Sequence, residues 1–220
     1  MESDAPEANA KLPADAAEPV SAPEYWEAHY KARDTRWDLG EPAPPLIEYF
    51  SRPGAPQPPA SVFVPGCGRG HDALWLAQRG FDVLAADFTE SALDALRRRR
   101  RALWIPAERC RAEKHDVLRL PARLRASFDL VVEHTCFCAI DPSRRDEYVA
   151  NVAAVLRPGG RLVGLLYPFR APAPGPPFAV DEAELRRRFA TSFEIDWLET
   201  PSTSVERRRS EERLVMMTRR

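Results

Sequence analysis

The sequence feature that most constrains the fold of this chain is a glycine-rich turn between a predicted strand and a predicted helix. Residues 61–72 read SVFVPGCGRGHD, a β-branched and aromatic run followed by Gly66, Gly68 and Gly70, with helically spaced apolar residues beyond. Glycine accepts a positive φ and lets a ligand approach the backbone closely. The helix N-terminus adds unpaired N–H groups at the same point. The segment therefore predicts the first strand, turn and helix of a nucleotide-binding α/β domain.

The spacing of the glycines limits the class of ligand that the turn can bind. A dinucleotide fingerprint, Gly-x-Gly-x-x-Gly, would place glycine at position 71, where this chain has His71. The observed Gly-x-Gly-x-Gly lacks the third glycine that brings the helix close to the strand beneath a pyrophosphate. It favours an adenosyl ligand without a pyrophosphate, and S-adenosylmethionine (SAM) is the commonest of these. A plain connecting turn is the alternative interpretation.

An acidic residue in the next predicted strand supports the ligand interpretation. Residues 81–87 read FDVLAAD, and Asp87 follows Gly66 by 21 positions. A carboxylate at the tip of a second strand accepts hydrogen bonds from a ribose diol, and about 20 residues separate the two features in such units. The alternative is that Asp87 caps the helix predicted from position 89.

Length and charge limit the class of protein. With 220 residues, 44% of them hydrophobic, the chain is long enough for one domain with a full core. A net charge of −1 argues against a nucleic-acid partner. No run of about 18 apolar residues is present, so we expect no membrane partner and a cytoplasmic location. The four cysteines follow no zinc spacing, and we expect no metal site and no disulfide framework.

The N-terminal region divides into a tail and an aromatic segment. Residues 1–22 are rich in Ala, Pro, Glu and Asp, and we expect them to be disordered. Residues 23–220 then form a single domain, in which 23–59 is a helical cover with predicted helices at 23–33 and 44–52. Trp26, Tyr30 and Trp37 either pack this cover onto the domain or close over the cofactor, because aromatic faces attract a sulfonium cation.

The rest of the chain alternates strands and helices. After the strand at 81–87 we expect a helix at 89–103, a third strand at 110–117 ending on Asp116, and a fourth at 127–132 followed by Glu133 and His134. A helix at 141–156 stops at Pro-Gly-Gly (158–160), and a fifth strand at 161–167 ends on Tyr167. Further expected elements are a proline-rich loop at 172–177, a helix at 181–189, and strands at 193–198 and 213–218. The pattern predicts an α/β Rossmann-like fold with a mostly parallel seven-stranded sheet and helices on both faces.

Several motifs in combination resemble a known family. They are Pro-Gly-Cys-Gly-Arg-Gly-His-Asp at 65–72, Cys-Ala-Ile-Asp-Pro at 138–142, Arg-Pro-Gly-Gly at 157–160 and Gly-Pro-Pro-Phe at 175–178. From about Tyr25 onward the chain is similar to the thiopurine-methyltransferase-like family, and most similar to the plant-type thiol and thiocyanate (halide) methyltransferases and their bacterial relatives. The resemblance implies a class I SAM-dependent methyltransferase. It also implies that the cofactor contacts Trp26, Tyr30, Trp37, Gly66, Gly68, Asp87, Asp116, Glu133 and His134.

The expected activity is transfer of a methyl group to sulfur. The acceptor would be a small thiol, hydrosulfide or thiocyanate, with halide activity in addition. Aromatic thiols of thiopurine type and selenium or tellurium species are the alternatives, and an NAD-dependent oxidoreductase on a similar sheet is disfavoured by the glycine spacing. In-line transfer depends mainly on alignment and exclusion of water. Where a thiol must lose its proton, His134 and Tyr167 are the candidate catalytic residues. We expect a monomer.

Overall fold

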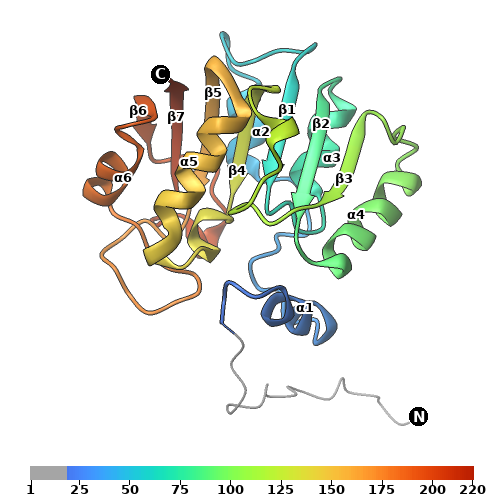
Figure 1. Ribbon diagram of the computed structural model, residues 1–220, viewed down its shortest axis with the longest axis horizontal. Coiled ribbons are helices and arrows are strands. Elements are labelled where there is room, and N and C mark those ends of the chain that lie inside the picture. The colour runs from blue at the N-terminus through green and yellow to red at the C-terminus, as the bar shows by residue number, and fades with distance from the viewer. Residues whose placement is uncertain (1–18) are drawn as a thin grey trace.

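The sheet orders its strands β3-β2-β1-β4-β5-β7-β6 in a computed structural model of the chain, which describes residues 19–220 (Figure 1). Strands β1 to β5 are parallel to one another, whereas β7 runs antiparallel between β5 and β6. This confirms the predicted mostly parallel seven-stranded sheet. The order reverses direction between β1 and β4, which is where open α/β sheets bind ligands.

The elements follow one another in regular alternation. The strands are β1 (Ser61–Pro65), β2 (Asp82–Asp87), β3 (Cys110–Lys114), β4 (Phe128–His134), β5 (Leu156–Leu166), β6 (Phe193–Glu199) and β7 (Arg213–Arg219). The α-helices are α1 (Pro23–Lys31), α2 (Pro44–Phe50), α3 (His71–Gln78), α4 (Glu90–Ala102), α5 (Arg145–Val155) and α6 (Glu182–Phe189). The β3–β4 connection carries only the 3-10 turn Ala122–Leu124.

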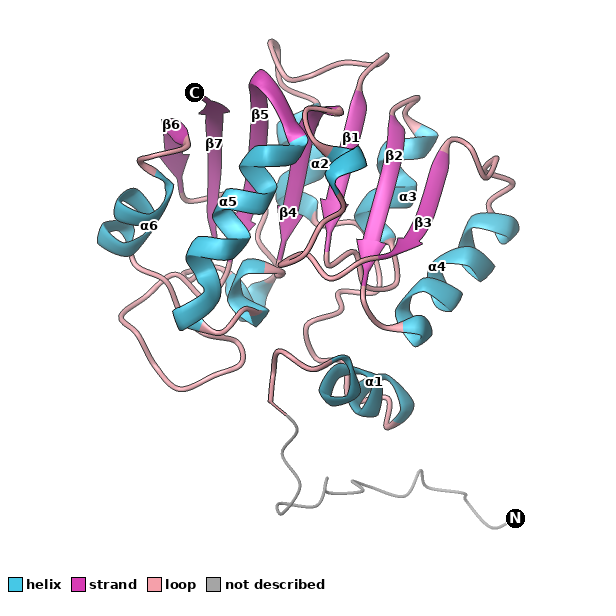
Figure 2. Ribbon diagram, viewed as in Figure 1, coloured by secondary structure: helices cyan, strands magenta, loops and turns pink. Residues whose placement is uncertain are grey.

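Two hydrophobic clusters hold helices on the two faces of the sheet (Figure 2). One face packs under α2, α3 and α4 through residues such as Phe50, Leu76 and Leu96. The other packs under α5 and α6 through Tyr148, Phe189 and their neighbours. Burial of such side chains stabilises the fold by roughly 1.5–3 kcal/mol each. The core therefore lies within the sheet and its two helical layers, and the strand ends remain free to form a site.

Three predicted boundaries need correction. Strand β3 ends at Lys114, so Asp116 lies in the loop beyond it, where its Oδ1 accepts the Leu118 N–H at 2.9 Å. The predicted fourth strand is longer than expected and includes His134. Helix α5 ends at Val155, and the Pro-Gly-Gly at 158–160 belongs to the start of β5. The Arg157 carbonyl and Leu156 side chain pack closely against Gly160 there, which leaves no room for a side chain.

Helix α1 lies beyond the carboxyl ends of the strands. The arrowheads of β2 and β3 point toward it in Figure 2. The Glu27 carboxylate of α1 accepts hydrogen bonds from the side chain and the backbone N–H of Ser91, in the first turn of α4. An acid at a helix N-terminus satisfies donors that the helix itself cannot. This contact fixes α1 over the edge of the sheet where the ligand is expected.

The predicted tail falls mostly outside the described residues, because positions 1–18 are not among them. Residues 19–22 are described, and the Ala22 N–H donates to the Pro19 carbonyl at 2.7 Å. None of the helices within 19–220 has the length and hydropathy needed to cross a membrane.

Candidate functional site

A cavity of about 510 Å³ opens at the carboxyl ends of the parallel strands. Its walls come from the residues that follow β1, β2, β3, β4 and β5, and from α1 with the segment after it. The volume is in the range of sites for small-molecule ligands and cofactors. Of the predicted site residues, the cavity brings together Trp26, Tyr30, Trp37, Gly66, Gly68, Asp87, Asp116, His134 and Tyr167.

The glycine turn lines the cavity with bare backbone. Gly66 and Gly68 have φ values of 53° and 52°, which side-chain-bearing residues rarely adopt. A Cβ added to Gly66 would lie 2.6 Å from the Cys136 Sγ, so the position has no space for one. Glycine is therefore required at Gly66 both by conformation and by close packing, as the sequence predicted for a turn that a ligand approaches.

Asp87 connects this turn to the end of β2. Its Oδ2 accepts the Gly68 N–H at 2.9 Å, and its Oδ1 accepts the Thr89 N–H at 2.9 Å and the Thr89 hydroxyl at 2.8 Å. Burial raises the pKa of the Asp87 carboxyl, while these hydrogen bonds act in the opposite direction. Asp87 thus holds Thr89, the N-cap residue of α4, and also lines the cavity, where its contact with a ribose stays a prediction. Oδ2 retains one lone pair for a ligand hydroxyl.

The aromatic residues of the cover form one cluster. The Trp37 ring meets Trp26 edge-on with centroids 5.3 Å apart, and Tyr30 with centroids 5.7 Å apart. The Trp26 indole N–H donates to the Val20 carbonyl at 2.8 Å. Burial, together with the charge of Asp87, raises the pKa of Tyr30, so its phenol stays neutral. The cluster is at once a packing unit of the cover and a wall of the cavity.

Asp38 ties the cover to the glycine turn. Its carboxylate lies 2.8 Å from Arg69 Nη1 and 3.1 Å from His71 Nε2, and it accepts the Gly40 N–H at 2.8 Å. Burial raises the pKa of Asp38, but the hydrogen bonds from His71 and Gly40 and the Arg69 charge outweigh it, and the pKa is lowered overall. The cover is therefore held to the domain by an ionised carboxylate.

His134 has both ring nitrogens engaged. Nδ1 lies 2.8 Å from Asp72 Oδ2, and Nε2 lies 3.1 Å from Arg208 Nη1. Arginine can only donate hydrogen bonds, so Nε2 must accept and Nδ1 carries the proton toward Asp72. In this arrangement His134 has no free lone pair to take a proton from an acceptor.

Arg208 joins the two ends of the chain at the cavity. Its side chain is 3% exposed, and its Nη2 donates to the Trp37 carbonyl at 2.6 Å. Nη1 lies 3.3 Å from the Glu212 carboxylate, and the guanidinium stacks 4.7 Å from the centre of the Tyr167 ring. Neighbouring Arg207 donates to the Asp38 carbonyl at 3.3 Å. These contacts hold the aromatic cover against the end of β5.

Glu133 does not line the cavity. It is 2% exposed, and its Oε1 accepts the N–H groups of Cys136 and Phe137, both at 2.8 Å. Burial raises the pKa of Glu133, and these hydrogen bonds partly offset the shift. The carboxylate thus fixes the backbone of the turn after β4 without lining the cavity itself. The cofactor contact that the resemblance implies for Glu133 stays a prediction, and its side chain lies outside the lining of the cavity.

The cavity is also lined by cysteine side chains, which are free thiols. Burial raises the pKa of Cys67 and Cys136 well above the ordinary value, and that of Cys138 to about 12, so these cysteines are neutral thiols and poor nucleophiles. Within residues 19–220, no group of three or more His, Cys, Asp or Glu side chains could hold a metal ion.

The residues present fit an adenosyl sulfonium ligand. The cavity combines a backbone turn with no room for a side chain, an acceptor atom on Asp87 and the ring faces of the cover. Burkholderia thailandensis 1,6-didemethyltoxoflavin-N1-methyltransferase, solved with S-adenosylhomocysteine, superposes with a TM-score of 0.72 over 95% of this chain and 93% of that one, at 22% identity. A structure from a study of the conversion of a disulfide bond into a thioacetal group during echinomycin biosynthesis superposes with a TM-score of 0.73. The superposition covers 89% of this chain and 92% of that one, at 23% sequence identity. The fold is that of a class I SAM-dependent methyltransferase.

The sequence comparisons identify the family within that class. Residues 21–220 match the family thiopurine S-methyltransferase (TPMT), and the chain belongs to it. It is therefore a SAM-dependent S-methyltransferase. Thiocyanate methyltransferase 1 of Arabidopsis thaliana is 33% identical over 71% of this chain and 66% of its own length. The thiopurine S-methyltransferase of Pseudomonas aeruginosa is 30% identical over 80% of this chain and 85% of its own length.

Sequence reasoning missed the cations and acids that surround the predicted residues. Arg208 lies 171 positions from its partner Trp37, in an arginine-rich stretch without any diagnostic spacing. Asp72 stands inside the glycine motif, directly after His71, and could have been suspected from that position. Asp38 adjoins Trp37, but its partners Arg69 and His71 become visible only in three dimensions.

Proposed function

We propose that the enzyme methylates small sulfur acceptors that are already ionised when they bind, such as thiocyanate, hydrosulfide or a thiolate. One observation carries this proposal: the best-placed candidate base, His134, has both nitrogens bound, to Asp72 and Arg208. SAM supplies an electrophilic methyl group on a sulfonium sulfur. A soft anion attacks such a methyl without further activation, so a site in which both nitrogens of His134 are occupied suits it.

The residues around the acceptor end fit this role. The Arg208 guanidinium provides positive charge beside the cavity, partly balanced by Glu212, and its stacking holds the Tyr167 ring in the wall. The Tyr167 hydroxyl can donate a hydrogen bond to an anionic acceptor. His134 then acts as a positioning residue, because it links Asp72 in the first turn of α3 to Arg208.

The aromatic cover serves alignment and exclusion of water. Trp26, Tyr30 and Trp37 face the cavity as one cluster, and aromatic faces attract a sulfonium cation. Charges of the two reactants cancel in the transition state, so a drier cavity favours the reaction. The cofactor contacts proposed for Gly66, Gly68, Asp87 and Asp116 place the adenosyl ligand along the strand ends from β1 to the loop after β3. Iodide fits the same site, since it also needs no base.

The pH dependence for two thiols tests the proposal directly. We expect kcat/KM for an alkyl thiol to rise with pH up to the pKa of the thiol, about 8.5 for a cysteine-like group, and the profile for thiocyanate to stay flat. A second thiol of lower pKa, such as trifluoroethanethiol, should shift the midpoint downward by the difference between the two thiol pKa values. A midpoint that stays fixed for both thiols would identify a base on the enzyme and refute this mechanism.

The acceptor assignment needs a separate measurement. Headspace analysis with SAM and, in turn, thiocyanate, hydrosulfide, iodide and thiophenol should detect methylated products. If only thiophenol or a selenium species reacts, the acceptor is a larger or heavier nucleophile and the assignment to small ionised sulfur acceptors is wrong.

We further propose that the protein works as a cytoplasmic monomer. All four of its cysteines are free thiols, which suits a reducing compartment. Residues of the N-terminal cover and of the segment before β7 both contribute to the walls of the cavity. Light scattering coupled to gel filtration should give one chain of 24.8 kDa.

A further inference from the structure

Arg145, the first residue of α5, is a fully buried cation that does not line the cavity. Its side chain is 0% exposed, and its guanidinium stacks 4.5 Å from the centre of the Phe137 ring. Nη2 donates to the Phe178 carbonyl at 2.7 Å, and Nη1 donates to the Ala179 carbonyl at 3.1 Å and to Glu184 at 3.0 Å. A buried charge is costly unless it is paired, so this arginine has a specific task.

The carbonyls that Arg145 binds end the proline-rich loop. The loop base is closed by a parallel bridge between Phe169 and Val180, where the Arg170 N–H donates to the Val180 carbonyl at 3.0 Å. The Phe178 N–H donates to the Cys138 carbonyl at 2.8 Å. Phe178 is thus held on both sides, by Arg145 through its carbonyl and by the turn after β4 through its N–H.

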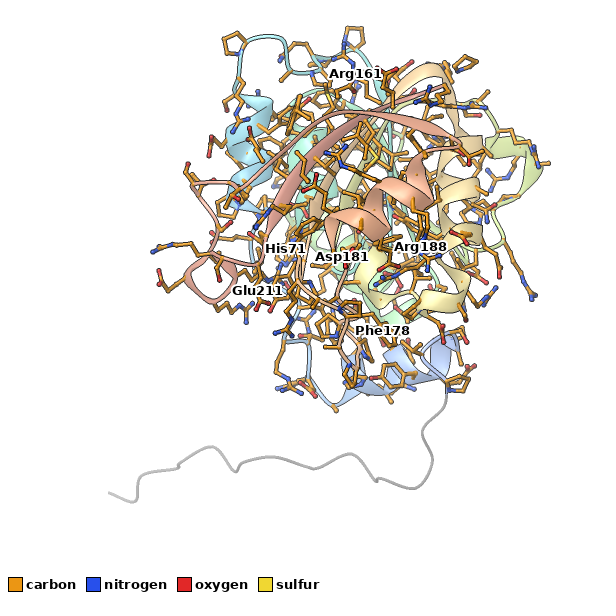
Figure 3. The ribbon with its side chains drawn as sticks, turned by 90° about the vertical axis from the view of Figure 1, so that its left-hand side faces the viewer. His71, Arg161, Phe178, Asp181, Arg188 and Glu211 are labelled. Atoms are coloured by element: carbon orange, nitrogen blue, oxygen red, sulfur yellow. The ribbon has the colours of Figure 1, made fainter. Side chains whose placement is uncertain are left out.

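The residues just before Phe178 form part of the cavity wall. Pro176 and Pro177 line the cavity, and so do Tyr167 and Cys138. Figure 3 shows Phe178 below Asp181 and Arg188, toward the blue N-terminal segment that covers the site. A shift of the Phe178 backbone would therefore move the proline wall relative to the cover.

Glu184 completes the arrangement and supplies a control. Its carboxylate accepts from Arg145 and also from Arg188 Nε at 2.6 Å. Arg188 in turn binds Asp146 and the Pro142 carbonyl, and has no contact with the loop carbonyls of 178 and 179 in the described structure. The two arginines share one acid, but only Arg145 binds the backbone carbonyls that directly follow the Pro176–Pro177 wall.

We propose that Arg145 is a positioning residue that sets acceptor specificity by fixing the Pro176–Pro177 wall. The inference rests on the proposed transfer to small sulfur acceptors and adds a determinant for their size. With the wall fixed, a small anion is confined beside Tyr167. With the wall loosened, the same cavity admits bulkier aromatic thiols at the expense of small ones.

The test compares Arg145→Lys with Arg188→Lys. Lysine keeps the charge but cannot hold two carbonyls and a carboxylate with one planar group. For Arg145→Lys we expect the KM of thiocyanate to rise by about tenfold to a hundredfold. The ratio of kcat/KM for thiophenol to that for thiocyanate should rise, and SAM affinity by calorimetry should stay within about twofold. Arg188→Lys should change neither acceptor parameter.

A structural readout separates this role from general stabilisation. Hydrogen exchange at the Phe178 amide should accelerate in Arg145→Lys and stay slow in Arg188→Lys. If Arg145→Lys does not fold, Glu184→Gln, which weakens both arginine contacts while keeping their shape, is compared with Arg188→Lys in the same assays. A lowered melting temperature with unchanged acceptor selectivity and unchanged Phe178 exchange overturns the proposal. If the wild-type enzyme methylates no sulfur acceptor, the proposed function fails first, and the exchange measurement still tests the loop contact.

Discussion

Asp87→Ala should weaken the binding of SAM, because it removes one hydrogen bond to the ribose of the ligand. In the structure, Oδ1 of Asp87 already accepts two hydrogen bonds from Thr89, and Oδ2 accepts one from Gly68. One lone pair on Oδ2 therefore remains for a ribose hydroxyl, where a free carboxylate tip would offer more. A charge-assisted hydrogen bond contributes about 1.5–3 kcal/mol, which corresponds to roughly a tenfold to 150-fold change in dissociation constant.

The difficulty is that Asp87 also organises the turn. Removing the carboxylate leaves the Gly68 and Thr89 donors without a partner, and this alone would weaken binding. A double-mutant cycle removes that contribution: S-adenosylhomocysteine and its 2′,3′-dideoxy analogue are titrated into the wild type and into Asp87→Ala by calorimetry. Damage to the turn affects both ligands equally and cancels in the cycle, so the coupling energy reports only the contact between carboxylate and ribose.

We expect a coupling energy of about 1.5–3 kcal/mol at pH 7. Burial raises the pKa of Asp87, so the ionised fraction, and with it the coupling energy, should fall as the pH is lowered through that raised pKa. A coupling energy near zero, with both ligands weakened to the same extent, would show that Asp87 acts only on the Gly68–Thr89 turn and would refute the ribose assignment.

Three further changes test the cover and the turn. Trp37→Ala should raise the SAM dissociation constant about tenfold, because it removes a ring face while the Trp37 carbonyl keeps its bond to Arg208; unchanged affinity with a large fall in melting temperature would favour pure packing. Gly66→Ala should lower the unfolding free energy by about 1–3 kcal/mol and abolish SAM binding, whereas Gly54→Ala, at φ 83° with nothing within 4 Å, isolates the backbone cost. The pKa of Asp38 is lowered in the fold, so its contribution to stability is complete above the unfolded value of about 3.9 and is lost as the pH falls through the folded value. The difference in unfolding free energy between wild type and Asp38→Asn, measured in urea, should thus be largest near neutral pH and shrink toward pH 2; a constant difference would contradict the assignment.

Local patterns in the sequence predicted the framework of the site. The glycine turn, the acid at the end of β2 and the alternation of strands and helices depend on spacing within a few tens of residues, and each was found where expected. Strand ends were less accurate: β3 stops at Lys114 and β4 continues to His134. The residue at which a strand ends depends on its pairing with neighbouring strands, and local β-propensity carries no information on that pairing.

The electrostatic partners could not be predicted, for a physical reason. His134 was identified as a candidate base from its place after β4, but its chemistry is set by Asp72, 62 positions away, and by Arg208, 74 positions away. A pattern of residue types does not specify which of the chain's many arginines meets which carboxylate. Glu133 shows the same limit, since its neighbour faces the cavity while its own carboxylate turns toward the backbone of Cys136 and Phe137.

The contact between Arg208 and the Trp37 carbonyl has a consequence for biosynthesis. The glycine turn and strands β1 to β5 emerge from the ribosome well before position 208. The nascent chain can therefore fold most of its sheet while the aromatic segment is held through Glu27 and Asp38 and still lacks its contact with Arg208. The cover gains its last contact with the domain only when the segment before β7 has been made. A ribosome-stalled chain that ends before η4 (Glu206–Arg208) should accordingly have a folded core and bind SAM more weakly than the full chain.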